Sequence, residues 1–386
     1  MKVLLLGSAS YKSSLTYFRL VSVGRQLVRH GWSATMIVPS ADKYNHFIPD
    51  KQASLDPIKL IQPWQLLTKL AVLNLVPYLL TSLVQILRSR ADSIYLYKPT
   101  PITIGGLVPK LLFGTPVILD LDDLGSEVMR LQGQSKIQVK LVAACENLAL
   151  RHASAVVVAS SYLQQLVLQR YPHKSVHVMS NGVDPTEFIC RSTTPPRPHI
   201  YYFGAINRLS LIEETLRAMP ATLAAVPNAQ MTIMGGGSAL QAAKDLAREL
   251  KIDQAITFTG WIDVRDAQQH VRFADIAICC QPDIPTVRAA SNLKVFQYMA
   301  MGSVPVVSDV GDLKSYIQDG QAGVAVPAGD SAQLAQALIE LLQNPRRRRE
   351  MAARARHQAE TVYSWDSLGN GLEVFVRNAG VDHGKI

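Results

Sequence analysis

The sequence has few cysteines, and their spacing is not that of a metal site. Its four cysteines are Cys145, Cys190 and the adjacent pair Cys279 and Cys280, and this pair lies in an apolar run where cysteine behaves as a small hydrophobe. Such usage fits the reducing cytoplasm. We therefore predict a cytoplasmic protein with no bound metal and no resident cofactor.

Charge is also scarce, and acidic charge is scarcer than basic charge. Charged residues make up 18% of the chain and hydrophobic residues 48%, which excludes a disordered protein. The net charge of +9 favours an acidic partner such as a nucleotide or an anionic lipid. No nucleic-acid-binding motif accompanies it, so we predict no nucleic-acid partner. The arginine run at 346–349 is interpreted as a solvated helix start, with contact to anionic lipid as the alternative.

The first strand-like run lacks a dinucleotide fingerprint. It ends at Gly7 without the Gly-x-Gly-x-x-Gly spacing, which counts against a dehydrogenase. The opening MKVLLLGSAS has only a five-residue apolar run, so we expect a first strand there rather than a signal peptide.

A chain of 386 residues is longer than a single hydrophobic core usually organises, so two domains are expected. In the first of them, helical patterns separate most of the strand-like runs, which predicts a parallel sheet wrapped by helices; these runs are 3–6, 34–38, 94–97, 117–120, 155–159 and 176–179.

Residues 70–87 contain no charge, and eighteen such residues reach the length of a candidate membrane span. Asn74, Pro77 and Gln85 disfavour a span, because polar groups and proline are costly or awkward in lipid. Two interpretations stay open: a buried helix of the first domain, or a helix lying on the membrane surface. Trp64 and nearby cations suit the second, so we consider peripheral membrane contact through residues 64–90.

Residues 288–311 combine a polar loop, a short helix, a glycine turn and a buried strand. Ser291 and Asn292 are favourable N-cap residues, and Leu293 begins the helical pattern. A helix that begins straight after such a loop offers free backbone N–H groups and the positive end of its dipole to an anion, and Lys294 adds a full charge. This stretch therefore predicts a phosphate-binding site.

Six further segments lie in the same order as in a known family. Together with this stretch they resemble the family 4 (group 1) retaining glycosyltransferases; the segments are NGVDPTEF at 181–188, YFG at 202–204, MTIMGGG at 231–237, ITFTGWI at 256–262, ADIAICC at 274–280 and YSWD at 363–366. The resemblance implies the α/β GT-B fold, in which two Rossmann-like domains have parallel sheets facing a central cleft. We expect an acceptor-side domain at 1–190, a proline-rich linker at 191–199, a nucleotide-sugar domain at 200–365, and a helix at 366–386 that packs back on the first domain.

The same resemblance implies transfer of a sugar, with retention, from a UDP- or GDP-linked donor to a glycan or lipid-linked acceptor. Such an enzyme would serve bacterial polysaccharide synthesis in the cytoplasm or at the inner face of the membrane. Lys294 and Arg208 are expected to stabilise the departing diphosphate, although the lysine that the family carries after Arg208 is absent. The predicted donor-binding residues are Gly204, Gly235, Gly236, Ser291, Asn292, Leu293 and Gln297.

A second departure concerns the two glutamates of the family pattern. Their positions hold Ala289 and Gln297 here; glutamine keeps an acceptor oxygen for the ribose, whereas alanine offers none. This loss motivates an alternative, a catalytically silent GT-B protein that binds a nucleotide sugar or a partner. An epimerase or phosphorylase on the same fold is disfavoured by the motif order.

The first domain carries a strand that ends in Asp-x-Asp-Asp, after a Lys-Pro-x-Pro segment similar to a bacterial subset of the family. We expect this acidic cluster at the carboxyl ends of strands, where open parallel sheets bind ligands; its members are Lys98, Asp120, Asp122, Asp123 and Glu127. Asp122 is assigned an acceptor-side role in preference to Mg²⁺ binding. Ser13, Ser14 and Arg19 either approach substrate or belong to a solvated loop.

Overall fold

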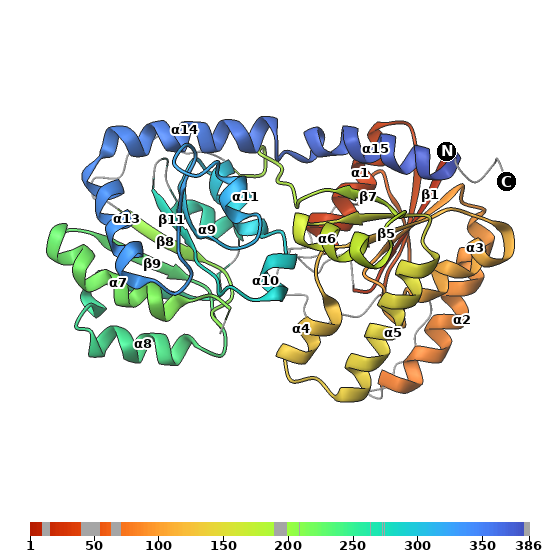
Figure 1. Cartoon of the computed structure of the whole chain (residues 1–386), viewed down its shortest axis with the longest axis horizontal. Coiled ribbons are helices and arrows are strands. Elements are labelled where there is room, and N and C mark those ends of the chain that lie inside the picture. The colour runs from red at the N-terminus through yellow and green to blue at the C-terminus, as the bar shows by residue number, and fades with distance from the viewer. Residues whose placement is uncertain are drawn as a thin grey trace. The chain divides into compact units, whose positions relative to one another are not determined.

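The computed structural model describes residues 1–9, 16–39, 55–62, 71–188, 199–207, 209–262, 264–271, 273 and 275–381. The chain divides into two compact units (Figure 1), which are Met1–Asn181 with Trp365–Ile386, and Gly182–Ser364. Almost all of the expected linker at 191–199 lies outside the described residues, as do Ser13 and Ser14. The expected parallel-sheet α/β architecture is confirmed in both units.

The first unit is built on a seven-stranded parallel sheet of order β3-β2-β1-β4-β5-β6-β7. Its strands are β1 (Lys2–Gly7), β2 (Ser33–Ile37), β3 (Lys59–Ile61), β4 (Ser93–Tyr97), β5 (Val117–Leu121), β6 (Ala155–Val158) and β7 (Ser175–Val178). Every residue of β4, β5 and β6 is buried, because helices cover both faces of the sheet, and this explains the continuous apolar runs. The edge strand β3 was not predicted.

Helices cover the two faces of this sheet (Figure 1). The helical elements of the unit are η1 (Thr16–Val21), α1 (Ser22–Arg29), α2 (Ala71–Ser89), η2 (Ile104–Leu107), α3 (Val108–Phe113), α4 (Gly125–Leu131), α5 (Lys136–His152), α6 (Ser161–Arg170) and α15 (Trp365–Val381). The C-terminal helix α15 packs on α1, where Leu372 and Val376 are buried and the indole N–H of Trp32 donates to Glu373 at 3.2 Å. The chain end therefore completes the core of the first unit.

Helix α2 contains the uncharged stretch found in the sequence. Its Ser82 and Ile86 are buried, whereas Val76, Leu80 and Val84 are exposed. The helix predicted to be buried in the first domain is therefore buried only in part. Within the described ranges, no helix combines the length and hydropathy needed to cross a bilayer.

The second unit repeats the same winding on a six-stranded parallel sheet of order β10-β9-β8-β11-β12-β13. Its strands are β8 (His199–Phe203), β9 (Gln230–Met234), β10 (Ile256–Gly260), β11 (Ile276–Cys279), β12 (Val304–Ser308) and β13 (Val324–Val326). Strand order reverses between β8 and β11. In open parallel sheets this switch point is where ligands bind, at the carboxyl ends of the strands.

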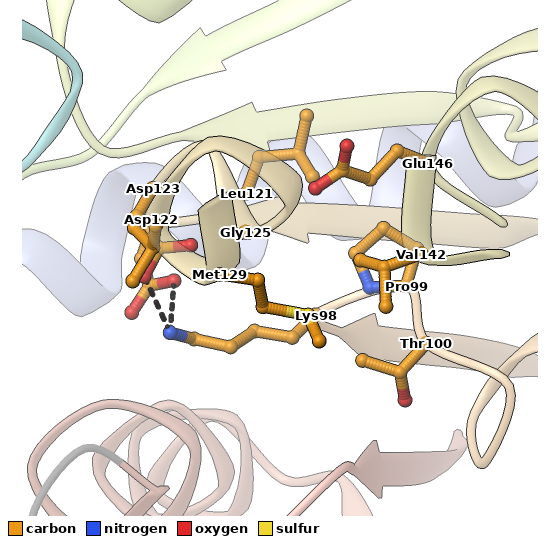
Figure 2. A pocket seen from close by; sticks show the side chains of 11 residues that line it. Lys98, Pro99, Thr100, Leu121, Asp122, Asp123, Gly125, Met129, Val142 and Glu146 are labelled. Atoms are coloured by element: carbon orange, nitrogen blue, oxygen red, sulfur yellow. Dashed lines mark hydrogen bonds and ion pairs between the residues drawn. The ribbon is translucent and has the colours of Figure 1, made fainter. Parts of the chain in front are cut away.

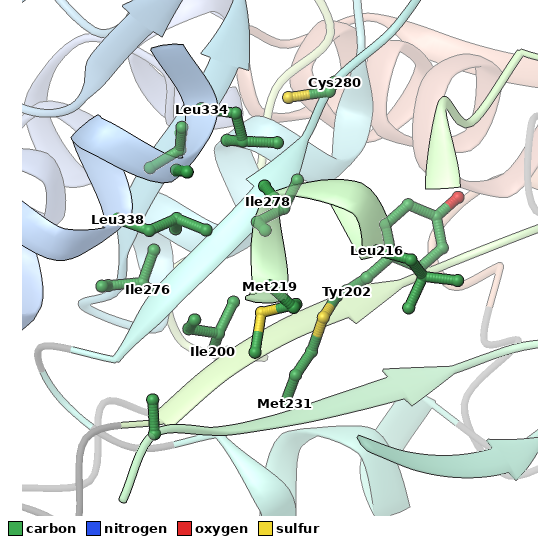
Figure 3. Close-up of a cluster of buried hydrophobic side chains, with 14 of the residues drawn as sticks. Ile200, Tyr202, Leu216, Met219, Met231, Ile276, Ile278, Cys280, Leu334 and Leu338 are labelled. Carbon is green, nitrogen blue, oxygen red and sulfur yellow. The ribbon is translucent and has the colours of Figure 1, made fainter. Parts of the chain in front are cut away.

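Apolar side chains from this sheet and its helices form the core of the second unit (Figure 3). Ile200, Ile276 and Ile278 from the strands pack with Met219 and Leu338 from the helices, and all five are fully buried. The helical elements are α7 (Ile212–Ala225), α8 (Leu240–Glu249), η3 (Asp253–Ala255), α9 (Val264–His270), α10 (Pro285–Ala289), α11 (Leu293–Ala300), α12 (Leu313–Tyr316), α13 (Ser331–Gln343) and α14 (Pro345–Thr361).

The arginine run begins α14 but is not uniformly solvated. Arg346 pairs with Glu350 at 3.1 Å on the surface. Arg348 is buried and donates to the carbonyl oxygens of Leu341 and Leu342 at the end of α13, at 2.7 and 3.2 Å. A cation at a helix C-terminus satisfies carbonyls that have no partner within the helix. The interpretation of this run as a solvated helix start is therefore wrong for Arg348.

Candidate active site

The switch point of the second unit brings together two glycine turns. Strand β8 continues into Gly204 and β9 into Gly235, both at positive φ. A Cβ on Gly235 would overlap the carbonyl oxygen of Gly204, so the two turns pack backbone against backbone. Gly236 lies beside the exposed Trp261, because a Cβ there would be 2.6 Å from the indole nitrogen. Glycine is therefore required at these positions, because a side chain would overlap neighbouring atoms.

This packing leads to a test of stability. We expect Gly235→Ala to lower the free energy of unfolding by at least about 2 kcal/mol, since alanine would add both the overlap and backbone strain. The matched control is Gly320→Ala, which also has positive φ but has no atom within 4 Å of an added Cβ. Urea unfolding followed by circular dichroism measures both. Equal losses in the two variants would contradict the proposed backbone packing.

Helix α11 begins at this same edge. The side chain of Asn292 accepts from the backbone N–H of Lys294 at 3.3 Å, which confirms it as the N-cap residue. Its amide nitrogen also donates to the Gln281 side chain at 2.5 Å, which holds the cap beside the end of β11. Ser291 is buried, and its hydroxyl oxygen accepts a hydrogen bond from the Tyr316 hydroxyl at 3.4 Å. It precedes the N-cap residue and supports the turn before α11.

The expected polar loop before α11 is shorter than predicted. Arg288 and Ala289 belong to helix α10, and Arg288 forms a two-pronged ion pair with Asp283 at 2.6 and 2.7 Å. Ala289 and Gln297 are both buried. The structure thus confirms a short helix with a polar cap, but the first two residues of the expected loop belong to another helix.

Lys294 is the cation of this site. Its Nζ lies 3.2 Å from the Tyr202 hydroxyl and 4.7 Å from the centre of that ring. The same side chain borders Gly204, because a Cβ on that glycine would meet Lys294 Cδ at 2.9 Å and Nζ at 3.1 Å. No carboxylate in the described part of the chain pairs with this ammonium. The switch point therefore presents a charge suited to an anion.

The other expected donor residues divide into two groups. Gly204, Gly235, Gly236 and Lys294 come together at the carboxyl edge of the sheet, whereas Arg208 lies outside the described residues. Leu293, the first residue of α11, is only partly buried, and Gln297 lies in the second turn of the same helix. Their contacts with a donor remain predictions. Tyr202, which positions Lys294, was not identified from the sequence.

Burial keeps the neighbouring thiols neutral. It raises the pKa of Cys279, and it raises the pKa of Cys280 to about 12. Neither thiol is therefore a negative charge that could neutralise Lys294 at physiological pH. Cys145 is also a free, buried cysteine, while Cys190 lies outside the described residues.

A polar cluster occupies the carboxyl edge of the first sheet (Figure 2). Lys98, at φ 58°, follows β4 and places its Nζ 3.1 Å from Asp122 Oδ1 and 2.7 Å from Asp123 Oδ2. The Tyr97 hydroxyl donates to Asp122 Oδ2 at 2.6 Å. Burial lowers the pKa of Lys98, but the two carboxylates outweigh it and the net pKa is raised, so the lysine stays charged. The expected position of these groups at strand ends is confirmed.

These side chains border a pocket of about 200 Å³ that has both polar and apolar lining (Figure 2). Glu146 of α5 also lines it and accepts from the backbone N–H and hydroxyl of Ser126 at 2.9 and 2.6 Å. Burial raises the pKa of Glu146, although the Ser126 bonds oppose this. Val128, Met129 and Val142 supply apolar lining. The pocket therefore offers carboxylates and one ammonium beside a hydrophobic surface.

Two residues of the expected cluster have other places. Glu127 pairs with Arg130 at 2.9 Å and does not line the pocket. Asp120 lies inside β5 and is fully buried. Within the described ranges, no group of His, Cys, Asp and Glu side chains is arranged to hold a metal ion.

Asp120 is the partner of Arg19. The Arg19 side chain, 1% exposed, donates to Asp120 at 2.7 to 3.0 Å and to the Asn181 side chain at 3.1 Å. The Tyr95 hydroxyl donates to the same carboxylate at 2.7 Å. The expectation of a solvated loop residue is therefore wrong for Arg19, because its guanidinium is buried and bound to Asp120. Its approach to a substrate stays a prediction.

Two units, each a parallel sheet with helices on its faces, are the GT-B fold, which solved glycosyltransferase structures share. Residues 19–182 match the family described as "Glycosyl transferase 4-like domain", and residues 197–344 match "Glycosyl transferases group 1". The chain belongs to this group 1, or family 4, of glycosyltransferases.

Solved structures share the fold over the whole chain. Sucrose-phosphate synthase from Thermosynechococcus elongatus has a TM-score of 0.76 at 17% identity and covers 98% of both chains. HepE from Anabaena, solved with UDP-glucose, has a TM-score of 0.71 at 16% identity, over 98% of this chain and all of that one.

Sequence relatives match over shorter regions. The GDP-mannose-dependent monoacylated α-(1-6)-phosphatidylinositol monomannoside mannosyltransferase of Corynebacterium glutamicum is 25% identical, over 58% of this chain and 63% of its own length. Two further curated relatives are matched over 65% and 55% of their length. The chain thus spans somewhat less than two thirds of the length of these three curated relatives.

Proposed function

We propose that this protein transfers a sugar, with retention of configuration, from a nucleotide-sugar donor to a glycan or lipid-linked acceptor in the cytoplasm. The observation that carries the proposal is the Lys294 ammonium beside Gly204 at the switch point of the second unit. A cation that no described carboxylate neutralises, between glycine turns and the start of a helix, suits a diphosphate. Membership of the glycosyltransferase family supplies the reaction class.

The leaving group sets the chemistry at this site. As the glycosidic bond breaks, negative charge grows on the diphosphate, and Lys294 with the first N–H groups of α11 stabilises it. Arg208 is proposed as the second cation, and Gln297 as the ribose partner. The departing phosphate takes the proton of the acceptor hydroxyl on the same face, so no covalent enzyme nucleophile is needed and configuration is retained.

The donor is proposed to be UDP- or GDP-linked. The HepE structure that shares the fold was solved with UDP-glucose, which supports UDP. The name of the mannosyltransferase relative specifies GDP-mannose, which supports GDP. Both nucleotides present the same diphosphate to Lys294, so the cation alone does not select between them.

Asp122 is proposed to orient the acceptor hydroxyl, because it lines the pocket at the carboxyl edge of the first sheet. We expect Asp122→Asn to reduce donor turnover about 10²-fold, in line with the loss of a positioned catalytic carboxylate. Asparagine keeps an oxygen for the Tyr97 hydroxyl, and binding of the nucleotide, measured by calorimetry with UDP and GDP, should not change.

The control for Asp122 is Glu127→Gln, a carboxylate of the same unit that pairs with Arg130 outside the pocket. It should leave turnover within about twofold of the wild type, as is usual for a surface pair. Full activity of Asp122→Asn would remove Asp122 from the proposed acceptor site.

A silent binding protein is the second candidate, favoured by Ala289 and Gln297 at positions where the family has glutamates. A panel of UDP, GDP and their sugars, read by thermal shift and donor hydrolysis in the same wells, separates the two. A specific ligand raises the melting temperature by mass action. Stabilisation with hydrolysis supports the transferase, stabilisation without hydrolysis supports the silent protein, and no response would contradict both.

A further inference from the structure

The excess positive charge of the chain belongs entirely to the first unit. Met1–Asn181 with Trp365–Ile386 contains 21 lysine and arginine residues against 12 aspartate and glutamate residues, an excess of +9. Gly182–Ser364 contains 18 of each, so its net charge is zero. A nucleotide site in the second unit therefore leaves the +9 unexplained. Such a one-sided field favours an extended anionic partner of the first unit.

Exposed apolar side chains are concentrated in the same unit. Of the sixteen large hydrophobic residues exposed within the described ranges, eleven lie on four helices of the first unit, α2 to α5: Val76, Leu80, Val84, Leu87, Leu111, Leu112, Phe113, Leu131, Ile137, Leu141 and Leu148. Helices α2, α3 and α5 lie side by side on one face of the sheet and all contact η2 (Figure 1). We call their outer surface the α2–α3–α5 face.

Two features gather exposed apolar side chains on α2 and α3. On α2, Val76, Leu80, Val84 and Leu87 recur at helical spacing, which places them in one stripe. On α3, residues 111–113 are three consecutive apolar residues, 63%, 63% and 72% exposed. A run of this kind is unfavourable on a solvated helix. A pocket of about 400 Å³, lined by residues of α2 and by Phe113, lies between the two helices.

The charge on this face is mainly basic, and the one acidic residue of its three helices, Glu146 on α5, accepts hydrogen bonds from Ser126. Helices α2 and α3 contain no aspartate or glutamate. Arg88 and Arg90 are exposed where α2 ends, and Lys136 and Lys140 are exposed on α5. Aliphatic residues flanked by cations are the pattern of an element that lies in a membrane interface.

We propose that the α2–α3–α5 face docks on an anionic lipid bilayer, with Leu112 and Phe113 inserted at the boundary of headgroups and acyl chains and with Arg88 and Lys140 on lipid phosphates. A protein partner is disfavoured by composition, because the large exposed hydrophobic residues described on this face are aliphatic or Phe. Protein interfaces favour Tyr, Trp, Phe, Met and Arg anchors, whereas Leu and Val, which make up most of this face, are under-represented among them. The inference goes beyond the proposed function, since lipid docking requires neither a donor nor turnover.

Vesicle flotation of the full chain tests the proposal. Two vesicle types are compared, phosphatidylcholine alone and the same lipid with about a quarter of phosphatidylglycerol, because anionic headgroups attract polybasic surfaces. The wild type should float with the anionic vesicles at low salt, and raising the salt or omitting phosphatidylglycerol should weaken the partitioning. Wild-type protein that stays in the lipid-free fraction under every condition would overturn the proposal.

Matched variants separate insertion from charge. Leu112→Ser with Phe113→Ser should lower partitioning by roughly tenfold or more, because each buried large apolar side chain contributes about a tenfold factor. Arg88→Gln and Lys140→Gln should each lower binding to anionic vesicles by about fivefold and leave the neutral vesicles unaffected. The control is Val374→Ser on α15, 55% exposed in the same unit, which should bind like the wild type.

Two further measurements decide whether a lipid bilayer or a second copy of the chain binds this face. Circular dichroism must show that Leu112→Ser with Phe113→Ser stays folded, which its exposure leads us to expect. If this variant floats as well as Val374→Ser, the face is not the lipid contact and the proposal fails. If the wild type is a dimer that ignores vesicles and the variant is a monomer by light scattering, the face joins two copies and the proposal is likewise wrong.

Discussion

Lys294→Ala should reduce turnover of the preferred nucleotide sugar by about 10²- to 10³-fold, the loss typical when a group that stabilises developing negative charge is removed. Nucleotide diphosphates should also bind more weakly, whereas the bare nucleosides should bind equally to both proteins. The reason is the position of the ammonium, 3.2 Å from the Tyr202 hydroxyl and against Gly204, where no described carboxylate neutralises it. Steady-state hydrolysis and calorimetry measure the two effects.

The matched control is Lys244→Ala. Lys244 is another lysine of the second unit that lies over an aromatic ring, with its Nζ 5.9 Å from the centre of Phe258. Because its Nζ lies over Phe258 and not beside Gly204, its loss should change turnover by less than about twofold, as expected for a surface substitution. Equal activity of Lys294→Ala and Lys244→Ala would remove Lys294 from the diphosphate site.

Arg19→Met should lower the free energy of unfolding by about 3–5 kcal/mol, the usual result of removing one partner from a buried ion pair. The remaining Asp120 would keep only the Tyr95 hydroxyl, 2.7 Å away, as a described side-chain donor. The control is Arg29→Met, whose pair with Asp366 is exposed and should contribute less than about 1 kcal/mol. Denaturant unfolding at neutral pH compares them.

The stability difference should also depend on pH. Burial raises the pKa of Asp120, and Arg19 opposes that effect. Without the arginine the folded-state pKa lies further above the unfolded value of about 3.9, so the cost of the variant is largest at neutral pH and declines as pH falls through the folded-state pKa. Adding Asp120→Asn to Arg19→Met should recover part of the loss. A difference that stays constant as the pH falls from neutral toward the unfolded pKa of about 3.9 would contradict the account.

The sheets could be predicted because their signal is local. Strands such as β5 and β12 are buried on both faces, so they appear in the sequence as apolar runs. Strand β3 was missed because KLI is short, lies at the sheet edge and is only partly buried, which leaves no such run. Helix α10 was missed because its five residues are too few to show helical periodicity.

The candidate sites could be predicted in part. Asn292 and Lys294 were found because a cap and a charge at a helix start form a local pattern. Arg19 was misplaced because its burial depends on Asp120, 101 residues away, and no local pattern reports that pair. Glu146 was missed for the same reason, since it contacts Ser126 from the next helix. Partners that are distant in sequence decide whether a charge is structural or available to a ligand.

The central claim is that this site breaks a nucleotide-sugar bond with retention. The most direct measurement incubates the wild-type protein with UDP-glucose or GDP-mannose carrying ¹³C at C1 and follows the anomeric signals by NMR. The account predicts that one donor is consumed and that the first sugar product has the α configuration of the donor, before mutarotation mixes the anomers. A β product formed first would contradict retention, and a donor that binds but stays intact would show a silent binding protein.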